Sequence, residues 1–292
     1  MRILYAVGAY VMWGVFPVYW KLLKHVPALQ LLSHRIIWSF VSLILLILLL
    51  RQWKNFYCAV KQPKVLLVYL IAAIMITINW FVYIWAVNAG FIIEASLGYF
   101  ISPLVSVLMG VLFLREKLRP AQWIAVGLAG AAVIYLIVFY GQALWIGLVL
   151  AFSFGSYGLI KKVAQLNAFY GLTLETATMF LVALIYLFYV EGTGNGILFH
   201  TNLTTDILLI GSGLVTTIPL LMFASAVRHA DLSLVGFLQY ICPTLQFLIG
   251  KFVYQEKFTS VQFIGFGVIW LALAIFILEG IVVYRKMFLH KL

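Results

Sequence analysis

The stretch Tyr-Phe-Ile-Ser-Pro at residues 99–103 is matched 140 residues later by Gln-Tyr-Ile-Cys-Pro at residues 239–243. After each copy the same residue types return at the same distances, without a gap. The matched pairs are Gly110 and Gly250, Glu116 and Glu256, Lys117 and Lys257, Gln122 and Gln262, and Gly127 and Gly267. The pattern predicts two halves, residues 1–140 and 141–292, the second of which ends in a basic tail.

The composition is that of a membrane protein. Hydrophobic residues make up 65% of the 292 residues, whereas ordinary soluble domains contain about 45–50%. Apolar stretches of about 20 residues, long enough to cross the bilayer core as a helix, recur throughout. We predict an all-α integral membrane protein with ten transmembrane helices, near residues 3–20, 29–50, 65–86, 92–114, 121–139, 142–160, 172–190, 206–227, 232–254 and 261–284.

Ten helices in two matched halves place an odd number, five, in each half. The second half must therefore enter the membrane in the opposite orientation. Such inverted repeats are typical of secondary transporters, in which the substrate site lies near the membrane midplane between the halves. We expect two inverted five-helix repeats that form one integrated transport unit. One chain can then form the whole pathway, so a monomer suffices, and a dimer stays an open alternative.

The net charge of +11 reflects topology more than a nucleic-acid partner. If the N-terminus is cytoplasmic, most of the lysines and arginines fall on the cytoplasmic side. The exceptions are Lys21, Lys24, Lys251 and Lys257 outside, and Arg35 within a span. The positive-inside rule then predicts a multi-pass protein of the cell inner membrane with both termini in the cytoplasm.

Several motifs resemble one transporter family over almost the whole chain. They are Ser-His-Arg-Ile-Ile-Trp-Ser (33–39), Asn-Trp (79–80), Leu-Gly-Tyr-Phe-Ile-Ser-Pro-Leu (97–104) and Leu-Gln-Tyr-Ile-Cys-Pro-Thr (238–244). Together with the two five-span halves and the Glu-Lys turns, they resemble the EamA-type families of the drug/metabolite transporter superfamily, and within it the RarD group. The resemblance implies a membrane permease. It does not choose among the amino acids, sugars, nucleotide sugars, drugs and other metabolites that the superfamily carries.

The repeated stretch itself supplies a candidate site. Two matching sets of residues each fall on one helical face: Tyr99, Ser102, Pro103, Ser106 and Gly110, and Gln239, Cys242, Pro243, Gln246 and Gly250. Each proline frees the carbonyl four residues earlier, and in a membrane a free carbonyl must be buried in protein or line a wet cavity. We expect two kinked, cavity-lining helices with hinges at the prolines and glycines. The alternative is that these residues only permit close packing.

Arg35 is the sharpest single candidate, because a cation within a span usually faces a cavity or a partner. Its planar donor fork suits a carboxylate or phosphate. Glu94, Glu175 and Asp231 read as residues at span ends, which leaves few acids to compete for that fork. The alternative is an arginine that extends to the outer membrane interface.

Other polar and aromatic residues extend this candidate site. His34 could carry a proton during transport, because imidazole titrates near physiological pH; a simple hydrogen bond to a neighbour is the alternative. Asn79, with Trp80 and Tyr83, offers an amide beside aromatic rings that can stack on a ligand. An aromatic wall could be completed by Trp38 and Tyr157, although many aromatic residues belong to interfacial belts.

The favoured function is secondary active transport by alternating access. The preferred substrate is an amino acid or another small molecule with an anionic group. The alternatives are an exporter of drugs or of neutral or cationic metabolites, and a facilitative pore. An enzyme is not expected, because no catalytic constellation appears. No phosphate-binding loop or metal-ligand motif is present, so we expect no cofactor and no metal. The expected partners are the substrate and the lipid bilayer.

Overall fold

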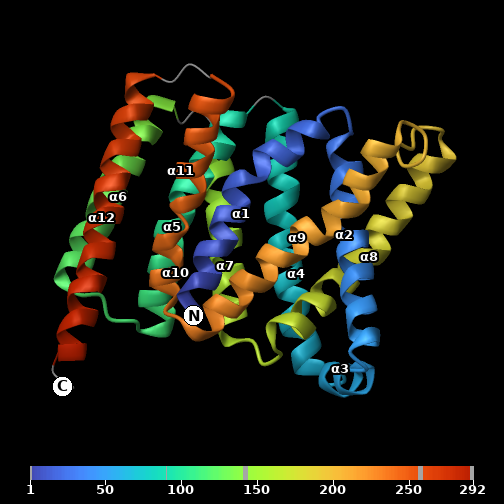
Figure 1. Cartoon of the computed structure of the whole chain (residues 1–292), viewed down its shortest axis with the longest axis horizontal. Coiled ribbons are helices and arrows are strands. Elements are labelled where there is room, and N and C mark those ends of the chain that lie inside the picture. Colours follow the sequence, from blue (N-terminus) through green and yellow to red (C-terminus); the bar gives the residue numbers. More distant parts are fainter. Residues whose placement is uncertain (1, 90, 141–143, 256–258, 290–292) are drawn as a thin grey trace.

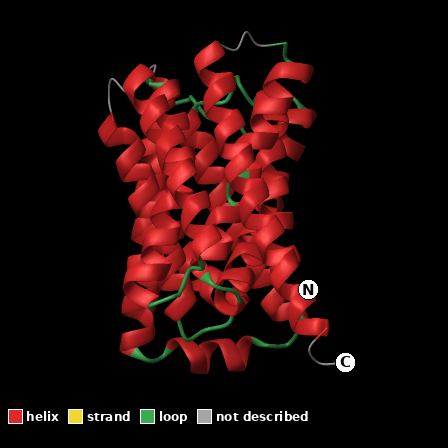
Figure 2. Ribbon diagram, turned by 90° about the vertical axis from the view of Figure 1, so that its left-hand side faces the viewer, coloured by secondary structure: helices red, strands yellow, loops and turns green. Residues whose placement is uncertain are grey.

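The computed structural model describes residues 2–89, 91–140, 144–255 and 259–289, and within these ranges the chain is helical without a strand (Figures 1 and 2). Gly141, near which we placed the join between the halves, lies outside the described residues, as do Glu256 and Lys257. The helices are α1 (Arg2–Leu22), α2 (Ala28–Leu49), α3 (Trp53–Val60), α4 (Pro63–Asn88), α5 (Ile92–Leu114), α6 (Pro120–Tyr140), α7 (Leu144–Val163), α8 (Ala168–Gly192), α9 (Leu203–His229), α10 (Leu232–Leu238), α11 (Ile241–Leu248), the π-helix η1 (Ile249–Val253) and α12 (Ser260–Leu289).

Ten stretches of this fold are membrane-spanning in character. Among the described residues, 9 helical segments are long and apolar enough to cross a membrane, and the apolar helix Gly98–Leu114 within α5 adds another. One of the spans, Leu232–Val253, consists of α10, α11 and η1 in succession. Helix α3, with 8 residues, is too short to span. The prediction of an all-α membrane protein with about ten spans is confirmed.

Helix starts repeat with the offset that the sequence shows. Helices α2 and α8 begin at residues 28 and 168, α4 and α9 at 63 and 203, α5 and α10 at 92 and 232, and α6 and α12 at 120 and 260. Local signals differ between the copies. Helices α4 and α6 begin with proline, which is pre-organised for a first helical position. Helices α8 and α9 begin after Asn167 and Asn202, whose side chains accept backbone N–H groups.

The helices exchange partners in a regular way. Helix α1 packs against α9 and α11, whereas α7 packs against α4 and α5; α2 packs against α9, whereas α8 packs against α4. Under the offset of 140 residues, α7 corresponds to α1, α8 to α2, and α9 to α4, so each of these contacts has a counterpart. Helices α5 and α10 pack directly on each other, and α6 pairs with α12 at one side of the bundle (Figure 1).

The bundle has two distinct ends. Helix α1 begins and α12 ends at the same end, which also carries α3; we call it the termini end (Figure 1). The connections between α1 and α2 and between α8 and α9 lie at the opposite end, which we call the far end (Figure 1). At the termini end, buried apolar residues of α1, α9 and α10 fill the bundle, among them Ala6, Phe223, Val227 and Leu232.

Helix α5 closely approaches α10 at this end. A Cβ atom on Gly236 would lie 2.5 Å from the Cβ of Ser106 and 3.2 Å from the carbonyl oxygen of Pro103. Only glycine therefore fits at Gly236, and the two backbones come together as small residues allow between membrane helices.

The proline-containing spans differ from the expectation of two matching kinks. Helix α5 is continuous through Pro103, whereas the other span breaks between α10 and α11, just before Pro243. The carbonyl of Gln239 accepts the N–H of Cys242 at 3.0 Å. The expectation that Pro243 leaves this carbonyl open is wrong, because a tighter turn supplies a nearer donor. Gly250 lies in the π-helix η1.

The first Glu-Lys turn fastens the two halves together. The carboxylate of Glu116 accepts the N–H groups of Leu232 at 2.6 Å and Ser233 at 2.8 Å, at the start of α10. A carboxylate is favourable there because the first N–H groups of a helix lack partners within the helix. The glycine at Gly110 makes the contact possible, since a Cβ there would clash with the Glu116 carboxylate.

Candidate functional site

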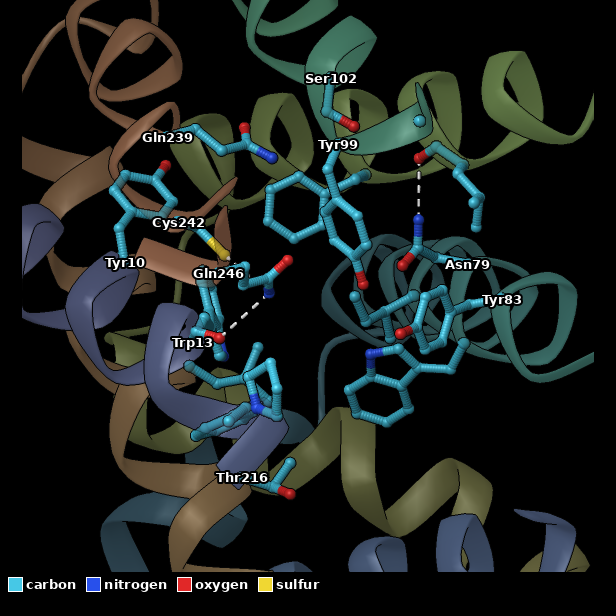
Figure 3. A pocket seen from close by; sticks show the side chains of 18 of the residues that line it. Tyr10, Trp13, Asn79, Tyr83, Tyr99, Ser102, Thr216, Gln239, Cys242 and Gln246 are labelled. Carbon is cyan, nitrogen blue, oxygen red and sulfur yellow. Dashed lines mark hydrogen bonds between the residues drawn. The ribbon is translucent and has the colours of Figure 1, made fainter. Parts of the chain in front are cut away.

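A cavity of about 240 Å³, which we call the central cavity, opens among α1, α2, α4, α5, α7, α9 and α11 and the turn between α10 and α11 (Figure 3). It brings together most of the predicted site residues. They are Arg35, Asn79, Trp80, Tyr83, Tyr99, Ser102, Gln239 and Gln246. These side chains come from both halves of the chain, and they converge although as many as 211 positions separate Arg35 from Gln246.

The central cavity lies toward the far end of the bundle. Helix α1 lines it with residues 10–20 and α4 with residues 76–83, in each case the part of the helix nearer the far end. Helix α5 contributes residues 98–102 from its own first half. Below it, toward the termini end, lie the apolar cluster described above and the Glu116 contact. The cavity therefore has a packed floor.

Arg35 is held by aromatic rings and one hydroxyl. Its guanidinium carbon lies 4.7 Å from the centre of the Trp20 ring and 5.1 Å from that of Trp80. Its Nε donates to the Thr216 hydroxyl at 3.0 Å. Within the described residues, no ion pair involves Arg35, and the residues that line the cavity include no Asp or Glu. The outer guanidinium nitrogens are thus oriented but not neutralised by a carboxylate.

Two buried polar atoms in the cavity wall have no hydrogen-bond partner among the described residues. They are the hydroxyl of Tyr10 and the Oε1 atom of Gln239. Buried polar groups in proteins are nearly always hydrogen-bonded, so an unpaired atom in a cavity wall marks a place where a ligand can bind. Gln246 is already engaged by the Trp13 carbonyl and the Cys242 sulfur, each at 3.4 Å (Figure 3).

Asn79 has a mixed role. Its Nδ2 donates to the Leu150 carbonyl at 2.8 Å and to the Ser153 hydroxyl at 3.1 Å, and so ties α4 to α7 (Figure 3). The residue also lines the cavity. Its amide nitrogen is therefore already hydrogen-bonded within the protein. The adjoining aromatic residues had indicated contact with a ligand and not this link between helices.

Aromatic residues of α1 form a wall that our sequence analysis missed. Tyr10, Trp13, Phe16 and Trp20 line the cavity, and Trp13 packs edge-on against Phe154 with ring centres 6.0 Å apart. Their spacing of three or four residues places them on one helical face. That spacing was the available signal. Thr216 and Cys242 also line the cavity, and Cys242 had been placed on the cavity face but not among the ligand contacts.

Three of the predicted site residues lie away from the central cavity. His34 is buried and lines a separate cavity of about 410 Å³ with Glu191 and His200. The backbone of Trp38 lies against Gly213 of α9. The hydroxyl of Tyr157 donates to Glu175 at 3.0 Å. These residues share motifs or helices with cavity residues but point in other directions.

The structure corrects our interpretation of Glu175. We placed it at a span end, but Glu175 lies within α8, and Lys161 lies within α7. Each side chain is 2% exposed, and Lys161 Nζ lies 2.7 Å from Glu175 Oε1. The ion pair explains how both charges are tolerated, since buried charges in proteins are paired. The pairing joins α7 to α8, and no local sequence signal indicates that the two residues meet.

Comparisons with known proteins agree on one family. Residues 1–138 match the family described as the EamA-like transporter family. The chain is 48% identical to "Uncharacterized transporter YojE" of Bacillus subtilis, over 94% of this chain and 92% of that one. It is 41% identical to "Protein RarD" of Escherichia coli, over 97% and 96% of the two chains. It is also 30% identical to "Chloramphenicol-sensitive protein RarD" of Pseudomonas aeruginosa, over 92% and 91%.

The fold also matches a solved structure. A protein known from its crystal structure superposes with a TM-score of 0.70 over 94% of this chain and 96% of its own length. At 18% sequence identity, this likeness concerns the fold alone.

Proposed function

Because the chain belongs to the EamA-like transporter family, as a RarD-type multi-pass membrane transporter, we propose that it carries small molecules with an anionic group by alternating access. The observation that carries this proposal is the state of Arg35. Its guanidinium lines the central cavity between two tryptophan rings, and no carboxylate of the described residues pairs with it. A carboxylate or phosphate on the substrate would supply the missing charge.

The remaining cavity wall suits an apolar or aromatic body on the same substrate. Rings of Trp13, Phe154 and Tyr99 surround the space, and such rings contribute large contact areas with directional hydrogen bonds. An amino acid fits this description. Its ammonium group could bind at Gln239 Oε1, which has no partner within the described part of the chain, or over an aromatic face.

Alternating access is supported by the asymmetry of the bundle. The cavity lies toward the far end, whereas packing and the Glu116 contact close the termini end. With both termini in the cytoplasm, as the distribution of lysine and arginine favours, this conformation faces outward. Transport would then need the two inverted halves to rock about the substrate, so that the termini end opens and the far end closes.

A different substrate class has its own support. The aromatic lining would also accept neutral or cationic drugs, and the printed name of the Pseudomonas aeruginosa relative refers to chloramphenicol. A facilitative pore is the other alternative. Accelerated exchange of labelled against unlabelled substrate would separate a carrier from a pore, because a pore does not couple the two fluxes.

The test is thermal stabilisation of the purified protein by a panel of amino acids, organic anions, organic cations and neutral drugs. A ligand at about 100 times its dissociation constant stabilises the folded state by about 2.7 kcal/mol. We expect anions or zwitterions to raise the melting temperature of the parent and of Lys54→Gln, which removes an exposed charge on α3. Arg35→Gln should lose this response. Equal stabilisation of all three proteins by cations or neutral drugs alone would overturn the proposal.

A further inference from the structure

The ion pair of Lys161 and Glu175 stands apart from the central cavity but shares a wall with it. A small cavity of about 20 Å³ touches Glu175 and Tyr157. Ile76, Trp80 and Leu220 line both this small cavity and the central one. One layer of side chains thus separates the buried charges from the proposed substrate site. The space beside Glu175 has room for about one water molecule.

The same repeat relates this pair to Arg35. Adding the offset of 140 residues takes Arg35 to Glu175, Ile76 to Thr216 and Trp80 to Leu220. Arg35 lines the wide cavity toward the far end, whereas Glu175 touches the narrow one. If the halves are inverted, an opening of the termini end gives Glu175 the surroundings that Arg35 has now. Glu175 would then face a water-filled cavity.

The neighbours of Glu175 make its charge state important. Besides Lys161, the facing titratable groups are Tyr157 of α7, whose hydroxyl donates to Glu175, and Tyr69 of α4, whose ring lies 5.3 Å from Lys161 Nζ. Helix α9 adds Arg228, whose charge interacts electrostatically with Tyr69. Helix α2 contributes the apolar Ile36. Within the described residues, Glu175 is therefore the one acid of this cluster, with Lys161 as its ion-pair partner and Arg228 near Tyr69.

We propose that Glu175 is a proton-binding site, and that its protonation from the termini end breaks the ion pair with Lys161 and favours opening of that end. A hydronium ion at the termini end transfers a proton to Glu175 Oε1, so that an O–H bond forms there and a water molecule is left, and Lys161 keeps its own proton. The charge of the pair changes from zero to +1. Leaving one partner of a buried pair uncompensated is strongly unfavourable. Water that enters from the termini end would therefore stabilise the unpaired ammonium group of Lys161. This inference rests on the proposed alternating access.

The chain carries its own reporter of that opening. Cys242 is buried and lines the central cavity, whereas Cys58 is exposed on α3 at the termini end. In membrane vesicles, labelling of Cys58 by a membrane-impermeant thiol reagent identifies the vesicles that expose the termini end. In Cys58→Ser, the labelling rate of Cys242 in those vesicles then measures how often this end opens.

The experiment compares three proteins on the Cys58→Ser background, between about pH 5 and about pH 8. In the protein that keeps Lys161 and Glu175, access of the reagent to Cys242 from the termini end should rise as pH falls. Glu175→Gln, which mimics the protonated acid, should label about 5- to 150-fold faster at the higher pH and lose the pH response. Lys161→Met with Glu175→Met replaces both charges by apolar side chains and should label slowly at every pH. At each pH the labelling rate is expressed relative to that of the double variant, which cancels the ionisation of Cys242 itself, and the pH response is the change of this ratio with pH.

Different outcomes separate the two proposals. If the double variant keeps the pH response of the parent, Glu175 is not the proton site. The same conclusion follows if Glu175→Gln labels like the parent. The double variant tests the inference even if Glu175→Gln does not fold. If Cys242 reacts from the far end but never from the termini end in any variant or at any pH, alternating access fails, and the inference fails with it.

Discussion

Arg35 and Glu175 hold matching positions in the two halves, in α2 and α8, yet their surroundings differ. Arg35 lines a cavity of about 240 Å³ and has no carboxylate partner among the described residues. Glu175 is 2% exposed and lies 2.7 Å from Lys161. The contrast teaches that a charge within a membrane helix indicates a ligand only where the protein supplies no counter-charge. The cavity at Arg35 lies toward the far end, whereas the buried pair lies where the termini end is closely packed.

The largest effect should come from breaking the sealed pair. Lys161→Met leaves Glu175 buried without a counter-charge, and we expect it to lower the free energy of unfolding by about 3–5 kcal/mol. Arg35→Met should cost clearly less, because no carboxylate of the described residues pairs with Arg35 and would be left without a partner. Denaturant unfolding of the purified protein in one detergent measures both.

The double replacement Lys161→Met with Glu175→Met is the matched control for that prediction. Replacing both charges of a buried pair by apolar side chains is often neutral or stabilising, so most of the lost stability should return. Equal losses for Lys161→Met and Arg35→Met would contradict the difference in burial between the two sites.

The open site can be tested by its charge alone. In Cys58→Ser, an anionic thiol reagent should modify Cys242 from the far end about tenfold faster than a cationic reagent of similar size. The reason is that Arg35 is the one charged residue among the described residues that line the central cavity, and clefts of one charge concentrate the opposite ion by factors of about 10 or more. Arg35→Gln should abolish the preference, whereas Lys54→Gln should keep it. A preference for the cationic reagent would favour the cation or drug exporter.

The sequence could predict the scaffold because membrane helices are encoded locally. Length, hydropathy and the 140-residue repeat placed about ten spans, and the start of α2 at residue 28 and of α8 at residue 168 follows the repeat closely. Family membership was predictable for the same reason, since the motifs around Arg35, Asn79 and Pro103 are contiguous in sequence.

The details of the site depend on which helix faces meet, and the sequence does not encode this locally. Helical periodicity could have identified Trp13 and Trp20 as cavity residues. Nothing near Glu175 indicates that Lys161 neutralises it, because the partner lies on another helix. His34 adjoins Arg35 in sequence, but adjacent residues on a helix point about 100° apart, and His34 lines a different cavity.

The seal at the termini end should weaken more modestly when its capping carboxylate is removed. Glu116→Ala deprives Leu232 and Ser233 of their N–H acceptor, and loss of a helix cap typically costs about 1 kcal/mol. Labelling of Cys242 from the termini end should rise together with this loss. Asp231→Asn is the control, because the Asp231 side chain makes no capping hydrogen bond at the same helix start. A larger effect of the control would show that charge near the helix, and not the Glu116 contact, holds this end.

The smallest effect on stability is expected for Gln239, whose amide we expect to bind ligand. Asn79, whose amide links two helices, is the comparison within the central cavity. Gln239 Oε1 is buried without a hydrogen-bond partner among the described residues, so Gln239→Met removes an unmet acceptor and should leave the free energy of unfolding unchanged or slightly raised. Asn79→Leu instead removes the donor to Leu150 and Ser153 and should cost about 0.5–1.5 kcal/mol per hydrogen bond lost, although the Ser153 hydroxyl still donates to the Leu150 carbonyl. Stabilisation by ligand should show the reverse order and fall more in Gln239→Met. If Gln239→Met unfolds as readily as Asn79→Leu, Gln239 holds the fold together, and the cavity has one ligand contact fewer.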